Sequence, residues 1–310
     1  MDFFTHLMVG FIISSLASGS FHNSYVLFGT LMAGLPDFDV FLYPLWKSLP
    51  ITRHHGITHM IIFIVIVSAL VNILLAVFAG GADVLLFILM CLTGMSHIFG
   101  DFITTWGVSP FYPLTKKYTK LNLDTAVNPY LIVYFFVGVL FLTAVMAGHI
   151  PLSDMQTSAL LGMTYVAYFI ARAILKLYYT DRPENKGFTA LPTFSPAQWK
   201  FVKRIETDDE LKIVIKTNRL QEYVIPKEGL KDIKTCEDLV STYWHPKVQE
   251  YMRVFSYPYY TTDCKDGKFG ITWRSAEMGD NMQVDVNYDG DLKVNSEFKR
   301  VLKRLRSNKE

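Results

Sequence analysis

The chain has 310 residues, of which 51% are hydrophobic, and its formal net charge is +2. Residues 1–180 carry 14 of the 58 charged side chains and residues 181–310 carry the other 44, and each part is close to neutral. This balance excludes the electrostatic attraction on which nucleic-acid binding depends. We therefore expect a membrane domain over residues 1–182, a small soluble α+β domain over residues 183–310, and no nucleic-acid partner.

The first apolar region, residues 5–35, is interrupted. Apolar pieces at residues 7–17 and 25–35 flank ASGSFHNS, which is polar and rich in Gly and Ser. The region is either one interrupted span or two half-helices that enter and leave on one side, and irregular backbone at membrane depth needs protein or water around it. It lacks the basic residues that precede the apolar core of a signal peptide, so we expect it to be retained.

Four later runs are long enough to cross a bilayer, which takes about 20 apolar residues. They are residues 57–80, 84–103, 129–149 and 157–178. If all four cross, the loops that contain Lys47, Arg53, Lys120 and Lys186 fall on one side, and short basic loops face the cytoplasm. The sequence therefore predicts a multi-pass protein of the inner (plasma) membrane whose C-terminal domain is cytoplasmic.

The C-terminal part has the alternating pattern of short strands. The predicted strands are residues 211–216, 220–225, 268–273 and 282–286. Residues 296–306 place apolar side chains on one helical face with basic ones around it, which is typical of a docked surface helix or of a helix resting on anionic lipid. The three cysteines form no CxxC pair, so we expect reduced thiols and no disulfide framework.

Ionisable side chains in or beside a membrane segment are costly and usually functional. They gather here at one end of the predicted spans: His6, Asp37 and Asp39 in GLPDFD, His54, His55 and His59 in RHHGITHM, and His97 and Asp101 in GMSHIFGD. Neutral imidazoles and carboxylates are ligands of zinc, manganese and iron. His97 and Asp101 are four residues apart and so point from one helical face. We predict a shared metal site, and we favour the re-entrant arrangement of residues 5–35, which brings His6 to it.

These motifs, with THLMVG near the start and TTWGVSPFYPL after residue 103, resemble the YdjM-like family of inner-membrane metal-dependent hydrolases in order and spacing. The segment LPTFSPAQWKFVKRIETDD is similar to the one that follows the last span in the YfhP-like members of that family. The resemblance covers residues 1 to about 210. The family's HRG reads HHG here, with Arg53 one position earlier, and Asn128 stands where members often have Asp.

The resemblance extends distantly to zinc-dependent phospholipase C and P1 nuclease, and it implies a ligand set. The implied ligands, in chain order, are His6, Asp37, His59, His97 and Asp101. One or two Zn²⁺ ions are implied, with Mn²⁺ or Fe²⁺ as alternatives. The later His-x-His-x3-Glu ligands of the soluble enzymes have no clear match in this chain, which argues against a three-zinc site.

The predicted activity is hydrolysis of a phosphoester by metal-activated water at the cytoplasmic membrane edge. We assign Asp37, Asp39 and His55 to catalysis, because a carboxylate or imidazole there can orient or deprotonate the water. Arg53 and His54 would offset the charge of the substrate. The location favours membrane lipid as the partner and a phospholipid or another amphiphile as the substrate.

Four other functions are compatible with parts of the pattern. A transporter with a proton or metal relay needs polar groups through the full bilayer depth, and few are present. A di-haem cytochrome needs paired histidines in mid-span, and an intramembrane protease needs the HExxH motif, which is absent. A membrane anchor or regulatory protein, with a structural metal site and a partner-binding cytoplasmic tail, is the main alternative.

Overall fold

The computed structural model describes residues 1–39, 57–112, 114–115, 118–208, 210–217, 220–226, 256–265, 268–277, 279–289 and 291–295. The chain forms two compact units, Met1–Ile174 and Leu175–Glu310. Each unit is described by itself. The division between a membrane and a cytoplasmic domain after residue 182 stays a prediction.

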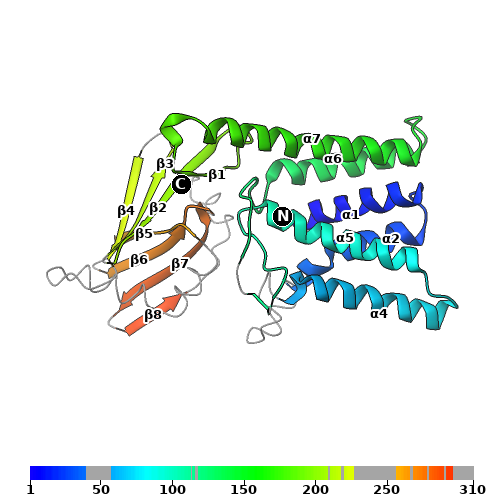
Figure 1. Ribbon diagram of the computed structural model, residues 1–310, viewed down its shortest axis with the longest axis horizontal. Coiled ribbons are helices and arrows are strands. Elements are labelled where there is room, and N and C mark those ends of the chain that lie inside the picture. The colour runs from blue at the N-terminus through cyan, green and yellow to red at the C-terminus, as the bar shows by residue number, and fades with distance from the viewer. Residues whose placement is uncertain are drawn as a thin grey trace. The chain divides into compact units, whose positions relative to one another are not determined.

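The first unit is helical (Figure 1). Its helices are α1 (Phe3–Ser18), α2 (Ser24–Gly34), α4 (Ile61–Ala79), α5 (Val84–Ile103), α6 (Pro129–Met146) and α7 (Asp154–Thr180), with short 3-10 turns η1 (Leu35–Phe38) and η3 (Ile57–His59). Among the described residues, α4, α5, α6 and α7 are long and apolar enough to cross a membrane. This confirms the four predicted runs as helices of spanning length.

Side-chain caps define where these helices begin. Asp83 accepts hydrogen bonds from the backbone N–H groups of the first turn of α5, and Asn128 accepts one in the first turn of α6. Such caps satisfy N–H groups that have no partner within the helix. Asn128 is therefore the N-cap of α6, directly before Pro129.

The interrupted N-terminal region forms a helical hairpin. Gly19 ends α1 in the left-handed conformation, with φ of 69°, which glycine adopts at little cost. Asn23 then caps α2, and the two helices lie side by side in opposite directions (Figure 1). The hairpin agrees with two half-helices, and its placement within a membrane stays a prediction.

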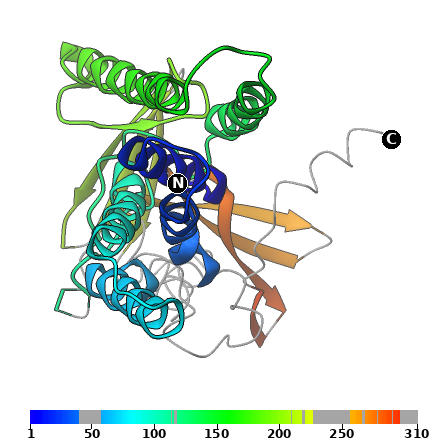
Figure 2. The same cartoon turned by 90° about the vertical axis from the view of Figure 1, so that its right-hand side faces the viewer.

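The α1–α2 hairpin lies between the other two pairs of helices (Figure 2). One apolar cluster joins it to α6 and α7: Met8, Ile12, Phe21, Leu142, Val145 and Leu161. A second joins it to α4 and α5: Met32, Ile64, Leu86, Met90, Ile98 and Val108. The hairpin is therefore the centre of the helical unit, and the residues that follow α2 are held at the end of this bundle.

Small residues let α1 and α2 approach closely. A Cβ atom on Gly10 would lie 2.4 Å from Cβ of Ala33, and one on Gly29 would lie 2.0 Å from Oγ of Ser14. Close approach through small residues is the usual packing of helices in lipid, where burial of apolar surface gives no advantage. On the outside of the bundle, Phe78 and Leu140 are 83% and 70% exposed, as expected for side chains that face lipid.

The segment between α5 and α6 is tied to the end of α5. Backbone hydrogen bonds run from Leu121 N to Phe102 O (2.7 Å) and from Leu123 N to Ile103 O (2.8 Å). The segment also pairs with itself at Val108 and Thr119. It therefore closes over the last turn of α5, where two of the predicted metal ligands lie.

The second unit contains two antiparallel sheets. Their strands are β1 (Thr189–Pro192), β2 (Trp199–Glu206), β3 (Glu210–Lys216), β4 (Leu220–Pro226), β5 (Pro258–Lys265), β6 (Lys268–Ser275), β7 (Gly279–Asp289) and β8 (Asp291–Asn295). Each sheet is a simple meander, β1-β2-β3-β4 and β5-β6-β7-β8. The four predicted strands are confirmed as β3, β4, β6 and β7, whereas the predicted helix at 296–306 lies outside the described residues.

Alternating side chains of the sheets form the core of this unit. Val202, Ile213 and Trp273 are fully buried. Lys200 Nζ donates to the carbonyl of Ala276, so strand β2 of one sheet contacts the turn that follows β6. Burial of one sheet face is the reason that the period-2 pattern could be read from the sequence.

Candidate metal centre

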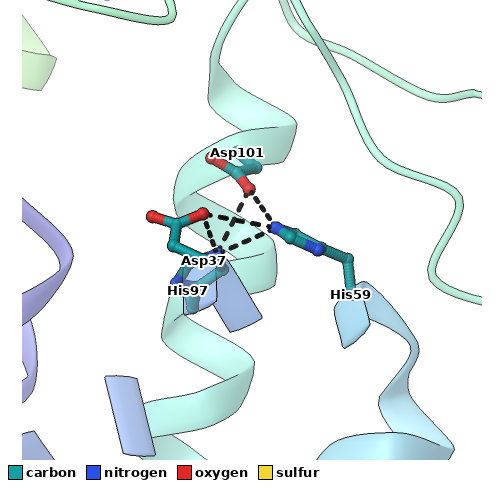
Figure 3. A group of neighbouring side chains, drawn as sticks. All are labelled: Asp37, His59, His97 and Asp101. Carbon is teal, nitrogen blue, oxygen red and sulfur yellow. Dashed lines mark hydrogen bonds and ion pairs between the residues drawn. The ribbon is translucent and has the colours of Figure 1, made fainter. Parts of the chain in front are cut away.

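Two histidines and two aspartates meet at one end of the helical unit (Figure 3). Asp37 follows α2 in η1, His59 ends η3 just before α4, and His97 and Asp101 lie in the last two turns of α5. All four side chains are buried, and His59 and His97 are 0% exposed. Three segments of chain, distant in sequence, therefore supply this group, which we call the His2Asp2 quartet.

One atom of each side chain faces the same point, and the four atoms lie within 4.8 Å of one another. Five separations are 3.2 Å (His59 Nε2–His97 Nε2), 3.6 Å (His59 Nε2–Asp37 Oδ1), 3.3 Å (His59 Nε2–Asp101 Oδ2), 3.5 Å (His97 Nε2–Asp37 Oδ1) and 3.4 Å (His97 Nε2–Asp101 Oδ2). A tetrahedral ion with ligands at about 2.0–2.2 Å has ligands about 3.3–3.6 Å apart. These five separations are close to those expected between ligands of one tetrahedral metal ion.

The α1–α2 hairpin sets the orientation of His97. Its Nδ1 lies 2.7 Å from the carbonyl oxygen of Ala33, in the last turn of α2. A carbonyl only accepts, so Nδ1 carries the hydrogen and Nε2 presents a lone pair to the quartet. A hydrogen bond of this kind commonly fixes the tautomer of a metal-binding histidine.

A second chain of hydrogen bonds orients His59. The hydroxyl of Thr58 donates to Oδ2 of Asp39 at 2.9 Å, and its oxygen lies 3.0 Å from Nδ1 of His59. Because the one hydroxyl hydrogen goes to the carboxylate, Nδ1 of His59 is the donor to Thr58. Nε2 of His59 is left with its lone pair directed at the quartet.

Four electron-rich atoms therefore face one another, and this arrangement needs a positive charge between them. Burial alone would lower the pKa of His59, but the carboxylates of Asp101 and Asp37 raise it above 6.5. Burial likewise opposes ionisation of Asp37, yet the imidazoles of His97 and His59 bring its pKa below the ordinary value. A proton or a metal ion can supply the charge, so the two compete and metal binding favours higher pH.

His6 lies beside the quartet. Its ring stacks on His97 with the ring centroids 3.6 Å apart. Its Nε2 is 3.2 Å from Oδ1 of Asp101, the carboxylate oxygen that also contacts the amino group of Met1. His6 therefore contacts two quartet members, His97 and Asp101, and a direct bond from His6 to a metal stays a prediction.

The other predicted site residues divide into two groups. Asp39 lies behind Thr58, with Oδ2 at 3.9 Å from Nδ1 of His59, so it faces the far side of that imidazole. Arg53, His54 and His55 lie outside the described residues. Their assignment to substrate binding and catalysis stays a prediction.

Loss of the Thr58 hydroxyl is expected to weaken metal binding without removing a ligand. In Thr58→Val, Nδ1 of His59 loses its acceptor, and the ring is free to turn or to change tautomer. Partners of this type contribute about 10–100-fold to metal affinity. Competition with a chromophoric chelator would measure the change in affinity. The control is Thr143→Val, at an exposed threonine near the C-terminal end of α6, which should bind metal as the parent protein does.

Sequence reasoning missed two buried charged residues near this end of the unit. Arg172 of α7 is 1% exposed and Asp124 is 0% exposed, and the two form an ion pair at 3.4 Å. The signal was present, because a charged residue within a predicted span has a functional or structural reason to be there. Arg172 and Lys176 are the two charged residues of the predicted run at 157–178, and the average hydropathy of the run concealed them.

Comparison with known proteins identifies the family to which the helical unit corresponds. The family model described as YdjM inner membrane protein matches residues 1–179, more than half of the chain. The chain belongs to the YdjM inner membrane protein family. The match includes all six described helices of the first unit almost to the end of α7, and every residue of the His2Asp2 quartet.

A curated relative is the uncharacterized protein YfhP of Bacillus subtilis (strain 168). It is 26% identical over 215 residues, which cover 64% of this chain and 64% of YfhP. The matched region thus falls short of two thirds of the relative's length. No solved structure matches the chain. Family membership shows an inner membrane protein, as the sequence predicts.

Proposed function

We propose that this member of the YdjM family is a membrane-bound, metal-dependent hydrolase of phosphoesters. The supporting observation is the buried His2Asp2 quartet, in which the two imidazole nitrogens lie 3.2 Å from each other and 3.3–3.6 Å from the two carboxylate oxygens. Nitrogen and carboxylate ligands in this geometry favour Zn²⁺, with Mn²⁺ and Fe²⁺ as the next candidates. An ion of this kind supplies Lewis acidity and lowers the pKa of water from about 15.7 towards 7.

The chain's own residues would handle the proton and the geometry. Asp37 directs Oδ1 at the quartet, and Figure 3 shows its second oxygen pointing away from His59. That oxygen is placed to accept a proton from an attacking water. Thr58 and Asp39 hold His59 in one tautomer, so Asp39 would act through His59 and not on the substrate.

The place of the quartet favours an amphiphilic substrate. Its members follow α2, precede α4 and end α5, so they lie together at one end of helices of spanning length. That end corresponds to the edge of a bilayer, where the phosphates of lipids also lie. We propose a phospholipid or another membrane-borne phosphoester as the substrate, at the cytoplasmic edge that the basic loops predict.

Metal removal tests the activity. The full chain, purified in detergent, is expected to contain about one zinc ion per molecule and to hydrolyse phospholipid in mixed micelles. Treatment with a chelator should abolish turnover, and added Zn²⁺ should restore it. A protein that holds its metal and yet turns over no phosphodiester, phosphomonoester or phospholipid would contradict the hydrolase.

One observation favours a second function, a membrane anchor or regulatory protein with a structural metal. Four buried protein ligands in a tetrahedral arrangement are typical of structural zinc, whereas catalytic zinc keeps a position open for water. The visible absorption of the Co²⁺-substituted protein distinguishes the two. A fifth ligand or a spectral change on addition of a phosphate ester supports the hydrolase, and a four-coordinate spectrum that esters leave unchanged supports the anchor.

The same geometry disfavours a di-haem cytochrome. Two axial histidines of one haem lie on opposite faces of the macrocycle, but Nε2 of His59 and Nε2 of His97 are only 3.2 Å apart. Two carboxylates share the site as well, which suits a harder metal ion than haem iron.

A further inference from the structure

A second buried polar network lies near the quartet. The carboxylate of Asp124 accepts hydrogen bonds from Thr125 N (2.8 Å), Asn128 Nδ2 (2.8 and 2.9 Å), Tyr168 OH (3.0 Å) and an amino nitrogen of Arg172 (3.4 Å). Nε of Arg172 donates to the carbonyl of Leu123 at 3.2 Å. The network thus joins α7 to the segment that precedes α6.

The backbone of Asp124 is joined to the end of α5. Its carbonyl accepts from Thr105 N at 3.1 Å, and Leu123 N donates to Ile103 O at 2.8 Å. Thr104 links this segment to the quartet. Its N–H (3.0 Å) and its hydroxyl (2.9 Å) both donate to the carbonyl of Asp101. Few bonds therefore separate the guanidinium of Arg172 from the backbone of a quartet member.

The ion pair has little value as a source of stability alone. Burial raises the pKa of Asp124, and the guanidinium of Arg172 opposes that shift. Replacement of a buried ion pair by apolar side chains of similar volume is often neutral or stabilising. What a buried, hydrogen-bonded network does provide is a fixed local geometry.

We propose that Asp124 and Arg172, with Tyr168 and Asn128, are positioning residues for the metal centre. They fix the last turn of α5 and so the direction of the Asp101 carboxylate. This inference rests on the proposed metal site, but it does not depend on whether the site is hydrolytic. It gives α7, which supplies no quartet residue, a role in metal binding.

A double variant tests the proposal. Asp124→Asn/Arg172→Met removes both charges at once, so no unpaired charge stays buried. The variant is expected to fold but to bind Co²⁺ and Zn²⁺ about 10-fold more weakly, the lower end of the effect of residues that orient metal ligands. The visible absorption of bound Co²⁺ should also change, because the angle at Asp101 changes. A merely structural pair would not move that spectrum.

Tyr168→Phe is the milder variant, for use if the double variant does not fold. It removes the hydrogen bond that Tyr168 donates to Asp124 and the one that it accepts from Asn128, but it keeps the ion pair. It should shift the Co²⁺ spectrum in the same direction. Tyr25→Phe is the matched control. It deletes a hydrogen bond of 2.6 Å to Asp83, the cap at the opposite end of α5, and it should leave affinity and spectrum unchanged.

The outcomes separate the two proposals. Variants that fold and bind Co²⁺ with the parental affinity and spectrum overturn the positioning role and leave the hydrolase intact. A parent protein that binds metal but hydrolyses nothing overturns the hydrolase, whereas weaker binding by the variants still supports positioning. A parent protein that binds no metal overturns both.

Discussion

The His97→Ala variant is expected to lose its metal and, with it, all hydrolytic activity. His97 contributes one of the four quartet atoms, and its hydrogen bond to the carbonyl of Ala33 directs Nε2 at the quartet. Residues that only orient ligands contribute about 10–100-fold, so removal of a ligand should cost at least about 100-fold in metal affinity. Elemental analysis and a hydrolysis assay on the same preparation would measure both losses.

The control for this experiment is a histidine that the structure places apart from the quartet. His149 follows α6 and is exposed, so His149→Ala should keep the metal and the activity of the parent. Retention of a full equivalent of metal by a folded His97→Ala protein would contradict the quartet as the binding site. Loss of activity with metal retained would instead point to a role of His97 in the reaction alone.

Substitution of Gly10 by Ala is expected to destabilise the helical unit and to weaken metal binding. In a helix this change usually stabilises by about 0.5–1 kcal/mol. Here the new Cβ would lie 2.4 Å from Cβ of Ala33 and 3.1 Å from the carbonyl oxygen of Gly29, neither of which can move without its helix. Overpacking of this kind costs about 1–3 kcal/mol, and the displaced Ala33 carbonyl no longer orients His97.

Gly138→Ala provides the matched comparison on α6. Its Cβ would meet Cε of Met8 at 2.8 Å, the end of a flexible side chain that can turn away. Thermal unfolding in detergent and titration with Co²⁺ should show a lower melting temperature and weaker binding for Gly10→Ala only. Equal behaviour of the two variants would contradict the role of the hairpin contact in orienting His97.

Much of the helical unit could be predicted because a bilayer leaves few alternatives. A run of about 20 apolar residues in lipid must satisfy its backbone internally, which makes it a helix. The run at 84–103 coincides with α5, and the spacing of His97 and Asp101 predicts their common face. Ionisable groups at membrane depth are costly and usually functional, and for this reason Asp37 and His59 are predicted to converge with this pair.

The features that could not be predicted depend on tertiary contacts, which produce no periodic pattern in the sequence. The carbonyl of Ala33 is a backbone group, so the residue type at position 33 does not indicate that it accepts a hydrogen bond from His97. Thr58 beside His59 suggests a helix cap, whereas its hydroxyl donates to Asp39. Strand β2, Trp199–Glu206, ends in four exposed residues, so its pattern is weaker than that of β3.

The order of the ligands along the chain has a consequence for biosynthesis. Asp37, His59, His97 and Asp101 all precede α6, so a ribosome delivers the complete donor set while α6 and α7 are still to be made. The guanidinium of Arg172, which pairs with Asp124, arrives only with α7. If the quartet binds its ion in the nascent chain, α6 and α7 would then close around a centre that is already complete.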